Sequence, residues 1–281
     1  MKTFDITKAV NARYSVRNYM NQTLDEAILT EIKAFIKEIH NPFGPEVNFH
    51  FLDQTMVVEG ERIGTYGVIK GASQYVGATI KEEPMALEAL GYVFETLVLY
   101  LASMGIGTCW LGGTFNRNGF KNVLGLDAQV LFPIVTPLGY PADKKHVVEV
   151  VMRRLIKADQ RKPWETLFFQ NSFETPLKQT GDEPFEHALE MLRLAPSASN
   201  KQPWRVVKEN QAWHFYEQIT PGYSDAFKYD IQRIDMGIAA AHFDLALKQS
   251  GIFGTFSVLE RPNIVAPNHA KYLFSWVRSG V

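Results

Sequence analysis

The apolar positions of the chain follow two different spacings, which together predict both helices and strands. Apolar residues three and four positions apart predict helices over residues 6–11, 25–39, 87–104, 118–124, 185–193 and 235–249. Short apolar and aromatic runs predict strands over residues 47–53, 74–81, 130–136, 205–208, 213–217, 254–260 and 271–279. Because the two kinds of element do not alternate regularly, we expect an α+β layered fold rather than a doubly wound sheet.

One apolar stretch has to be weighed as a membrane span, since residues 96–116 carry no charge. It contains four glycines that would interrupt a spanning helix in its second half: Gly105, Gly107, Gly112 and Gly113. The helix that no glycine interrupts therefore covers only Tyr92 to Met104. We expect a buried core helix there.

Two halves of the chain resemble each other. The segment 91–106 resembles the segment 237–252, and each is an apolar helix closed by a glycine, Gly105 or Gly251, and followed by a strand-like run. A second match, around Pro42 and Pro196, occurs in the same order. We expect two tandem copies, residues 1–160 and 161–281, although chance similarity of two amphipathic helices is the alternative.

The composition excludes several classes of protein. A formal net charge of −1 gives no reason to expect binding to nucleic acid or to an anionic membrane. A single cysteine, Cys109, excludes an internal disulfide framework and fits a reducing compartment. The N-terminus lacks an apolar signal core, so we expect a cytoplasmic protein. The basic segment 144–162 is interpreted as a solvated linker, from which one cation could still reach a phosphate.

A short segment near the N-terminus has side chains suited to hold a phosphate. Residues 13–17 carry two guanidinium groups and a hydroxyl within five positions. In an extended conformation Arg13, Ser15 and Arg17 project to one side, and we call these three residues the phosphate clamp. The alternative is a surface arginine pair bonded to acidic neighbours.

A second candidate segment lies far downstream. Residues 195–204, which we call the ring loop, are rich in proline, serine and asparagine and end on Trp204. Such a loop can present polar atoms to a flat heterocycle. A phosphate clamp joined to a ring loop suggests a phosphorylated planar cofactor.

A third segment, residues 105–113, which we call the glycine loop, begins like a dinucleotide fingerprint. It has Trp110 where the third glycine belongs and it follows a helix, so a nicotinamide-binding Rossmann turn is not expected. Gly112 and Gly113 could let a ligand approach bare N–H groups, with a tight turn as the alternative. No nucleophile elbow, phosphate-loop motif or metal-ligand spacing is present. We therefore assign no catalytic side chain and no metal, and expect the chemistry to come from a cofactor.

These three segments resemble the flavin-dependent nitroreductase family. The clamp resembles its Arg-x-Ser-x-Arg motif, the ring loop its Ala-Pro-Ser-x-x-Asn-x-Gln-Pro-Trp segment, and the glycine loop its Gly-Leu-Gly-Thr-Cys-Trp segment. Leu138 to Pro141 and Arg161 to Pro163 are similar to later family elements. The resemblance implies FMN as cofactor and NAD(P)H as electron donor, with a nitroaromatic, a quinone or a similar small molecule as acceptor.

The resemblance also implies roles for individual residues. The clamp and Arg161 would hold the FMN phosphate, and Tyr14 would also contact the cofactor. Leu111, Gly112 and Gly113 would offer backbone groups near flavin N5. The ring would be contacted by Pro196, Ser197, Ala198, Ser199 and Asn200. The family often has a lysine near flavin O2; residues 65–68 contain none, and Lys70 is a weak substitute.

The order of the motifs departs from the family pattern. In the family, clamp and ring loop lie in one subunit and serve different flavins of a homodimer, whereas here copy one keeps the clamp and copy two keeps the ring loop. The chain therefore resembles a tandem-fused, pseudo-dimeric nitroreductase with one FMN per chain, which permits a monomer. A flavin-binding store or redox sensor without turnover, and a degenerate scaffold that binds no flavin, are the alternatives.

Overall fold

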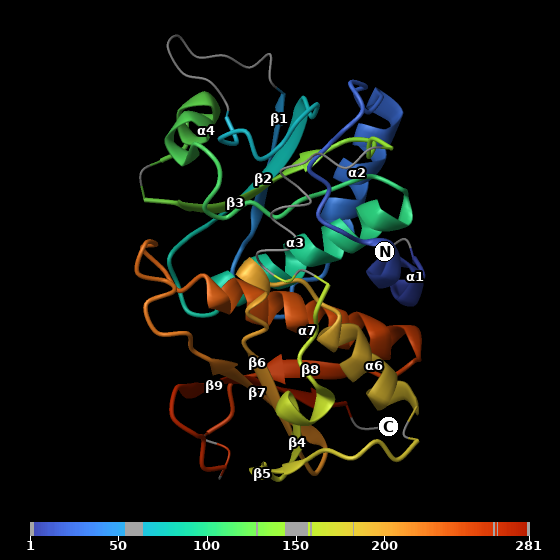
Figure 1. The fold of residues 1–281 in the computed structure, drawn as a ribbon, viewed down its shortest axis with the longest axis vertical. Helices are drawn as coiled ribbons and strands as arrows, with labels where there is room; N and C mark the ends of the chain where they lie inside the picture. The colour runs from blue at the N-terminus through green and yellow to red at the C-terminus, as the bar shows by residue number, and fades with distance from the viewer. Residues whose placement is uncertain are drawn as a thin grey trace. The chain divides into compact units, whose positions relative to one another are not determined.

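The structure is a computed structural model that describes residues 3–53, 64–127, 129–143, 157, 159–181, 183–260, 262 and 264–279 (Figure 1). Its internal contacts divide the chain into two compact units. Unit 1 comprises Met1–His40, Pro45–Ala86 and Val93–Ala158; unit 2 comprises Asn41–Gly44, Leu87–Tyr92 and Asp159–Val281. Most of the basic segment 144–162, including Arg153 and Arg154, lies outside the described residues.

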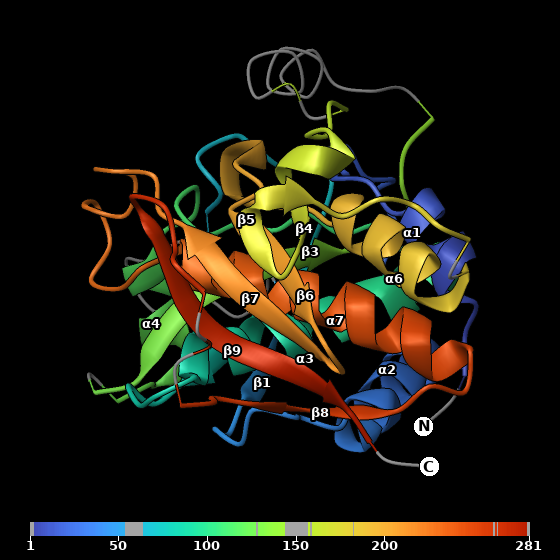
Figure 2. The same cartoon turned by 90° about the horizontal axis from the view of Figure 1, so that it is seen from below.

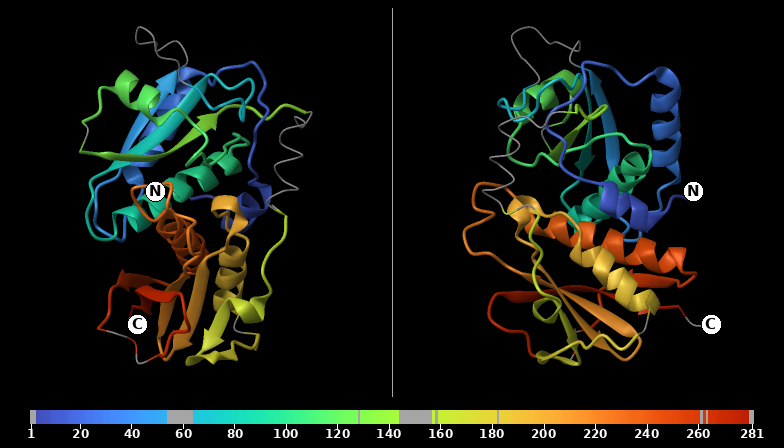
Figure 3. Two further views of the ribbon diagram at one scale, coloured as in Figure 1. Left: turned by 60° about the vertical axis from the view of Figure 1, so that its left-hand side comes forward. Right: turned by 45° about the vertical axis from the view of Figure 1, so that its right-hand side comes forward.

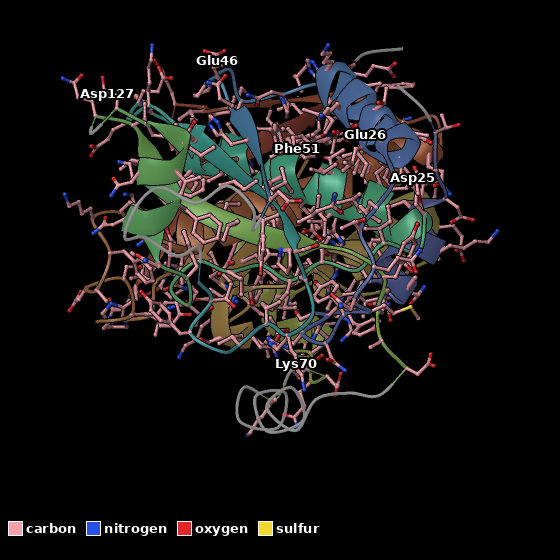
Figure 4. All side chains as sticks on the ribbon, turned by 90° about the horizontal axis from the view of Figure 1, so that it is seen from above. Asp25, Glu26, Glu46, Phe51, Lys70 and Asp127 are labelled. Atoms are coloured by element: carbon pink, nitrogen blue, oxygen red, sulfur yellow. The ribbon has the colours of Figure 1, made fainter. Side chains whose placement is uncertain are left out.

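Unit 1 is a three-stranded antiparallel sheet with helices. Its strands are β1 (Asn48–Asp53), β2 (Gln74–Ile80) and β3 (Leu131–Leu138), in the order β1-β2-β3. Its helices are α1 (Ile6–Ala12), α2 (Glu26–Glu38), most of α3 (Ala86–Ser103) and α4 (Arg117–Leu124). Asp5 and Asp25 are the N-caps of α1 and α2 and accept hydrogen bonds from the N–H groups of Lys8 and Ile28. Asp25 and Glu26 mark the start of α2 in Figure 4.

Unit 2 is a six-stranded sheet in the order β5-β4-β6-β7-β9-β8, seen from below in Figure 2. Its strands are β4 (Phe168–Gln170), β5 (Ser172–Pro176), β6 (Trp204–Glu209), β7 (Ala212–Gln218), β8 (Gly254–Ser257) and β9 (Ala270–Arg278). The helices α6 (Glu183–Arg193) and α7 (Gln232–Gln249) pack against each other on one face of the sheet (Figure 3). Two single turns, η1 (Trp164–Thr166) and η2 (Ala198–Asn200), complete the unit. Among the strands that the structure describes in this sheet, only β4 and β6 pair in parallel.

The two units repeat one order of elements. The order α2-β1-β2-α3-β3 in unit 1 corresponds to α6-β6-β7-α7-β9 in unit 2. Both α3 and α7 have 18 residues and end before a left-handed glycine, Gly105 (φ 75°) and Gly251 (φ 74°). In both, the next N–H returns to the helix at 2.9 Å, from Ile106 to the Leu101 carbonyl and from Ile252 to the Leu247 carbonyl. The sequence similarity therefore extends to local structure.

Unit 2 contains a close helix crossing. The first turns of α3, Leu87–Tyr92, belong to this unit and cross α7 at two glycines. A Cβ atom on Gly91 would lie 2.1 Å from the Ile234 carbonyl oxygen, and one on Gly237 would lie 2.1 Å from the Glu88 carbonyl oxygen. Both distances are far below van der Waals contact, so neither position has room for a side chain.

Most predicted elements are confirmed. The strands β4 and β5 were not predicted, α7 begins at Gln232 instead of residue 235, and β8 ends at Ser257 instead of residue 260. Among the described residues one helix, α3, is long and apolar enough to cross a membrane, with a mean hydropathy of 1.3 over 18 residues. Because 83% of that window is buried inside the protein, α3 matches the predicted core helix.

Candidate functional site

The phosphate clamp lies in an extended segment of unit 1 that is held on both sides by backbone pairing. The Val16 N–H donates to the Thr108 carbonyl at 2.8 Å, which joins the clamp to the glycine loop. On the other side, the Lys70 N–H donates to the Arg17 carbonyl, and the Tyr19 N–H donates to the Lys70 carbonyl, both at 2.9 Å. The segment is therefore fixed, and Lys70 lies next to the clamp.

Arg17 is a buried cation of unit 1. Its residue is 7% exposed, and its guanidinium donates one long hydrogen bond, 3.4 Å from Nη1 to the Ser15 carbonyl oxygen. Its buried Nε has no hydrogen-bond acceptor, and no carboxylate pairs with the guanidinium within the part of the chain that the structure describes. A buried charge is costly unless it is paired and hydrogen-bonded. An anion bound at the clamp would therefore supply the opposite charge and the hydrogen-bond acceptor that Arg17 lacks.

Arg13 has a different environment from Arg17. Its Nε lies 4.0 Å from Oε1 of Glu95, a fully buried carboxylate on α3. The other oxygen of Glu95 accepts a 2.8 Å hydrogen bond from the Trp110 indole N–H. Glu95 thus connects the clamp to the glycine loop. No motif marks Glu95 in the sequence, and the signal that could have found it is a carboxylate inside an apolar helical run.

A small cavity lies on one side of the clamp segment. Its volume is about 160 Å³, and its lining residues come from the clamp segment (Arg13, Tyr14, Val16), from positions 105–108 and from Ala12, Ala102 and Pro141. Ser15 and Arg17 do not line it. The cavity is smaller than the roughly 300–1,000 Å³ typical of ligand pockets, so it cannot enclose a whole mononucleotide.

The end of the glycine loop offers two N–H groups. Leu111 uses both backbone groups in a bridge to Val135, at 3.0 and 3.1 Å, and the Gly112 carbonyl accepts a hydrogen bond from Arg117 Nη2. Among the described residues, the N–H groups of Gly112 and Gly113 have no acceptor. The N–H groups available to a ligand are therefore those of the two glycines.

The ring loop of unit 2 is held in a strained conformation. Ser199, Asn200 and Gln202 have φ angles of 48°, 55° and 49°, in the left-handed region that non-glycine residues seldom adopt. Internal bonds hold the loop, since the Gln202 N–H donates to Ser197 Oγ at 2.8 Å. Tyr223 also donates its hydroxyl to Ser199 Oγ at 2.9 Å. Backbone strain of this kind is frequent at ligand sites.

Asp235, at the start of α7, anchors the ring loop through a hydrogen bond. Its Oδ1 accepts the Ala198 N–H at 3.0 Å, while its buried Oδ2 has no hydrogen-bond partner among the described residues. Burial raises the pKa of Asp235 well above its usual range, and the Asp230 charge adds to this rise. Asp235 was predicted only as a helix residue, and no motif identified it.

Arg161 reaches the same loop. Its Nη2 donates to the Leu194 carbonyl at 3.1 Å and its Nη1 lies 3.5 Å from Asn200 Oδ1. Unit 2 thus brings together Arg161 and the predicted ring residues, and unit 1 brings together the clamp, Tyr14 and the glycine loop. Among the described residues, no group of three or more histidine, cysteine or acidic side chains could hold a metal ion.

Comparison with known proteins decides the family. The family model described as "Putative TM nitroreductase" matches residues 5–247. The chain belongs to this family. The comparison with curated proteins finds no match.

Solved structures of nitroreductases are similar to the chain. A putative nitroreductase from Thermotoga maritima has a TM-score of 0.61 at 17% identity, and the match covers 99% of this chain and 95% of that one. A nitroreductase with bound FMN from Bacteroides fragilis has a TM-score of 0.42 at 18% identity over 52% of this chain and 92% of its own. A nitroreductase family protein from Clostridium novyi has a TM-score of 0.42 at 19% identity, over 51% and 90%. The Thermotoga match supports the mixed α+β nitroreductase fold over the whole chain.

Proposed function

We propose that the chain is an FMN-dependent oxidoreductase that passes electrons from NAD(P)H to a nitroaromatic, a quinone or a similar small acceptor. The observation that carries this proposal is Arg17, a buried guanidinium whose Nε has no acceptor among the described residues. A phosphate dianion would supply both the missing charge and the missing hydrogen-bond acceptors. Membership of the nitroreductase family supports FMN as the molecule that carries this phosphate.

The residues present fit the cofactor. Arg17 and Ser15 would bind its phosphate directly, and Arg161 would add a second guanidinium. Arg13 would contribute less charge, because Glu95 lies beside it. The N–H groups of Gly112 and Gly113 would point to the flavin edge, with Leu111 fixing the loop. Residues 196–200 would contact the ring. When bound, FMN supplies the hydride and electron chemistry, and the protein orients it and excludes water.

We further propose that the chain is a fused pseudo-dimer with one flavin per chain. Its support is the repeated order of elements and the reciprocal crossing, in which Gly91 meets Ile234 and Gly237 meets Glu88. In a two-fold interface residue i contacts j while j contacts i, as these pairs do. Copy one has no ring-loop motif and copy two has no Arg-x-Ser-x-Arg motif, so one complete site would remain.

An absorption spectrum of the purified protein, followed by turnover, tests the proposal. We expect the spectrum of bound flavin, release of FMN on denaturation, and NAD(P)H oxidation that accelerates when a nitroaromatic or quinone is added. Bound FMN that no nicotinamide reduces would support a flavin store or sensor instead. A colourless protein without affinity for FMN would contradict every flavin role.

A further inference from the structure

Unit 2 contains a pair of cations that meet at one carbonyl oxygen. Lys162 Nζ donates to the Gln202 carbonyl at 3.3 Å. Arg205 Nη1 donates to the same oxygen at 3.1 Å and to the Trp204 carbonyl at 2.6 Å. Arg161, the neighbour of Lys162, has other partners, Leu194 and Asn200. Lys162 and Arg205 therefore converge on one carbonyl oxygen of the ring loop.

This pair lacks a counter-charge. No ion pair joins Lys162 or Arg205 to a carboxylate within the described ranges. Burial lowers the pKa of Lys162 to about 8, and the nearby charges of Arg205 and Lys201 add to this effect. Burial also lowers the pKa of Arg205 to about 10. Like charges that are partly buried without a carboxylate repel each other, and an anion would relieve this repulsion.

We propose that Lys162 and Arg205 form a binding site for a phosphate monoester, built from unit 2 alone and additional to the FMN phosphate. A dianionic phosphate can accept several charge-assisted hydrogen bonds from lysine and arginine at once. Two sources carry this group: the 2′-phosphate of NADPH, which an arginine or lysine commonly accommodates, and free phosphate. Assigning the group to NADPH rests on the proposed function, whereas the phosphate site itself does not.

A purely structural role for the pair is the competing explanation. Gln202 has a left-handed backbone, with a φ of 49°, and the two cations could serve only to hold its carbonyl. That role predicts a loss of stability on substitution with no change in phosphate binding. A titration of phosphate binding therefore distinguishes the two explanations.

The test is calorimetric titration of the FMN-loaded protein with adenosine 2′-monophosphate, inorganic phosphate and adenosine. We expect the two phosphates to bind and adenosine not to bind. Lys162→Gln and Arg205→Gln should each weaken phosphate binding about tenfold or more, since a charge-assisted hydrogen bond is lost. Lys162→Arg should retain binding. Lys228→Gln, which removes an exposed lysine of unit 2, is the matched control and should change nothing.

Three results would overturn the proposal. The first is that neither phosphate binds. The second is that Lys162→Gln and Arg205→Gln both bind phosphate as tightly as the wild type. The third is that phosphate binds only after FMN has been removed. Competition of adenosine 2′-monophosphate with NADPH but not with NADH would identify the donor as the source. Tighter binding of inorganic phosphate, without such competition, would identify free phosphate. These titrations stay informative even if the protein oxidises no nicotinamide, so the two proposals can fail separately.

Discussion

Arg17 and Arg13 are both arginines of the Arg-x-Ser-x-Arg motif, but their surroundings in the structure differ. Arg17 has no carboxylate partner in the described structure, whereas Arg13 lies 4.0 Å from the buried Glu95. We expect Arg17→Ala to weaken FMN binding about 10- to 150-fold, which corresponds to the roughly 1.5–3 kcal/mol of a charge-assisted hydrogen bond. Fluorescence titration of the FMN-free protein measures this change.

The matched control for Arg17 is Arg278→Ala, which removes an exposed arginine and should leave FMN affinity unchanged. Arg13→Ala should weaken FMN binding as well, but less than Arg17→Ala, because Glu95 already offsets part of its charge. Equal FMN affinity in wild type and Arg17→Ala would contradict the clamp assignment.

Asp235 is expected to act through the ring loop. Asp235→Ala leaves the Ala198 N–H without its acceptor, which should lower the free energy of unfolding by about 1–3 kcal/mol. Asp235→Asn keeps an acceptor oxygen and should cost less. Denaturant unfolding measures both variants, with Asp225→Ala at an exposed carboxylate as control. Wild-type stability of Asp235→Ala would show that the loop does not depend on this bond.

Glu217 should make the stability of the protein depend on pH. Burial, followed by the charge of Asp230 and a hydrogen bond with it, raises its pKa from 4.5 to about 8. Between these values the unfolded chain has lost the proton that the folded protein still holds, so stability falls as pH rises from about 5 to about 8. Each pH unit in this window corresponds to at most about 1.4 kcal/mol.

Glu217→Gln checks this pH dependence, because it removes the titrating group with little change of shape. We expect the variant to gain stability relative to wild type at pH 8 and to show a flatter profile in thermal unfolding scans. A residual slope should remain, since burial also raises the pKa of Glu88. A wild-type profile that is flat between pH 5 and pH 8 would contradict this prediction.

At the scale of residues, the sequence could reveal groups that belong to motifs. Arg17 and Asn200 are predicted as site residues because each belongs to a motif, and these roles stay predictions. Glu95 and Asp235 could not be identified in the same way, since each lies in an apolar helix and acts on a loop that is distant in sequence. The convergence of Lys162 and Arg205 likewise depends on folding across 40 residues.

At the scale of elements, the glycine crossing in unit 2 gives a sharp prediction. Gly237→Ala would place a methyl group 2.1 Å from the Glu88 carbonyl oxygen and 2.9 Å from the Tyr92 nitrogen, both backbone atoms. Such overpacking should cost about 1–3 kcal/mol or more in chemical denaturation. The same change at Gly251 meets no atom within 4 Å and carries only the strain of a φ of 74°, so it should cost less.

Gly91→Ala should resemble Gly237→Ala, because its methyl group would meet the Ile234 carbonyl at the same distance. Equal costs at Gly237 and Gly251 would contradict overpacking at the crossing.

Elements with a clear start signal or a long apolar run were predictable. Asp25 gives α2 its N-cap, whereas α7 has Ile231 at its cap position without a side-chain hydrogen bond, and its start was placed three residues late. The strands β4 and β5 have only three and five residues and no consistent alternation, so periodicity could not reveal them.

At the scale of the whole molecule, the proposed single complete site fixes a stoichiometry. We expect acid-released FMN, quantified by absorbance against protein concentration, to approach one per chain after saturation. The reason is that the clamp and the ring loop each occur once. A saturated ratio near two would show that the second, incomplete arrangement of motifs also binds flavin.

The internal similarity predicts two copies divided at residue 160, and this division stays a prediction. The two contact units are not continuous along the chain, because Asn41–Gly44 and Leu87–Tyr92 belong to unit 2. Sequence similarity shows which segments are equivalent. It does not show which segments pack together, because packing depends on tertiary contacts.

A split protein made by dividing the coding region after residue 158 would not yield two autonomous folding modules. The C-terminal piece would lack the helical turns 87–92, and the close-packed surface of α7 at Gly237 would be open to water. Refolding of that piece would then require the N-terminal piece in trans. The two fragments would behave as a complementation pair whose recovery depends on concentration.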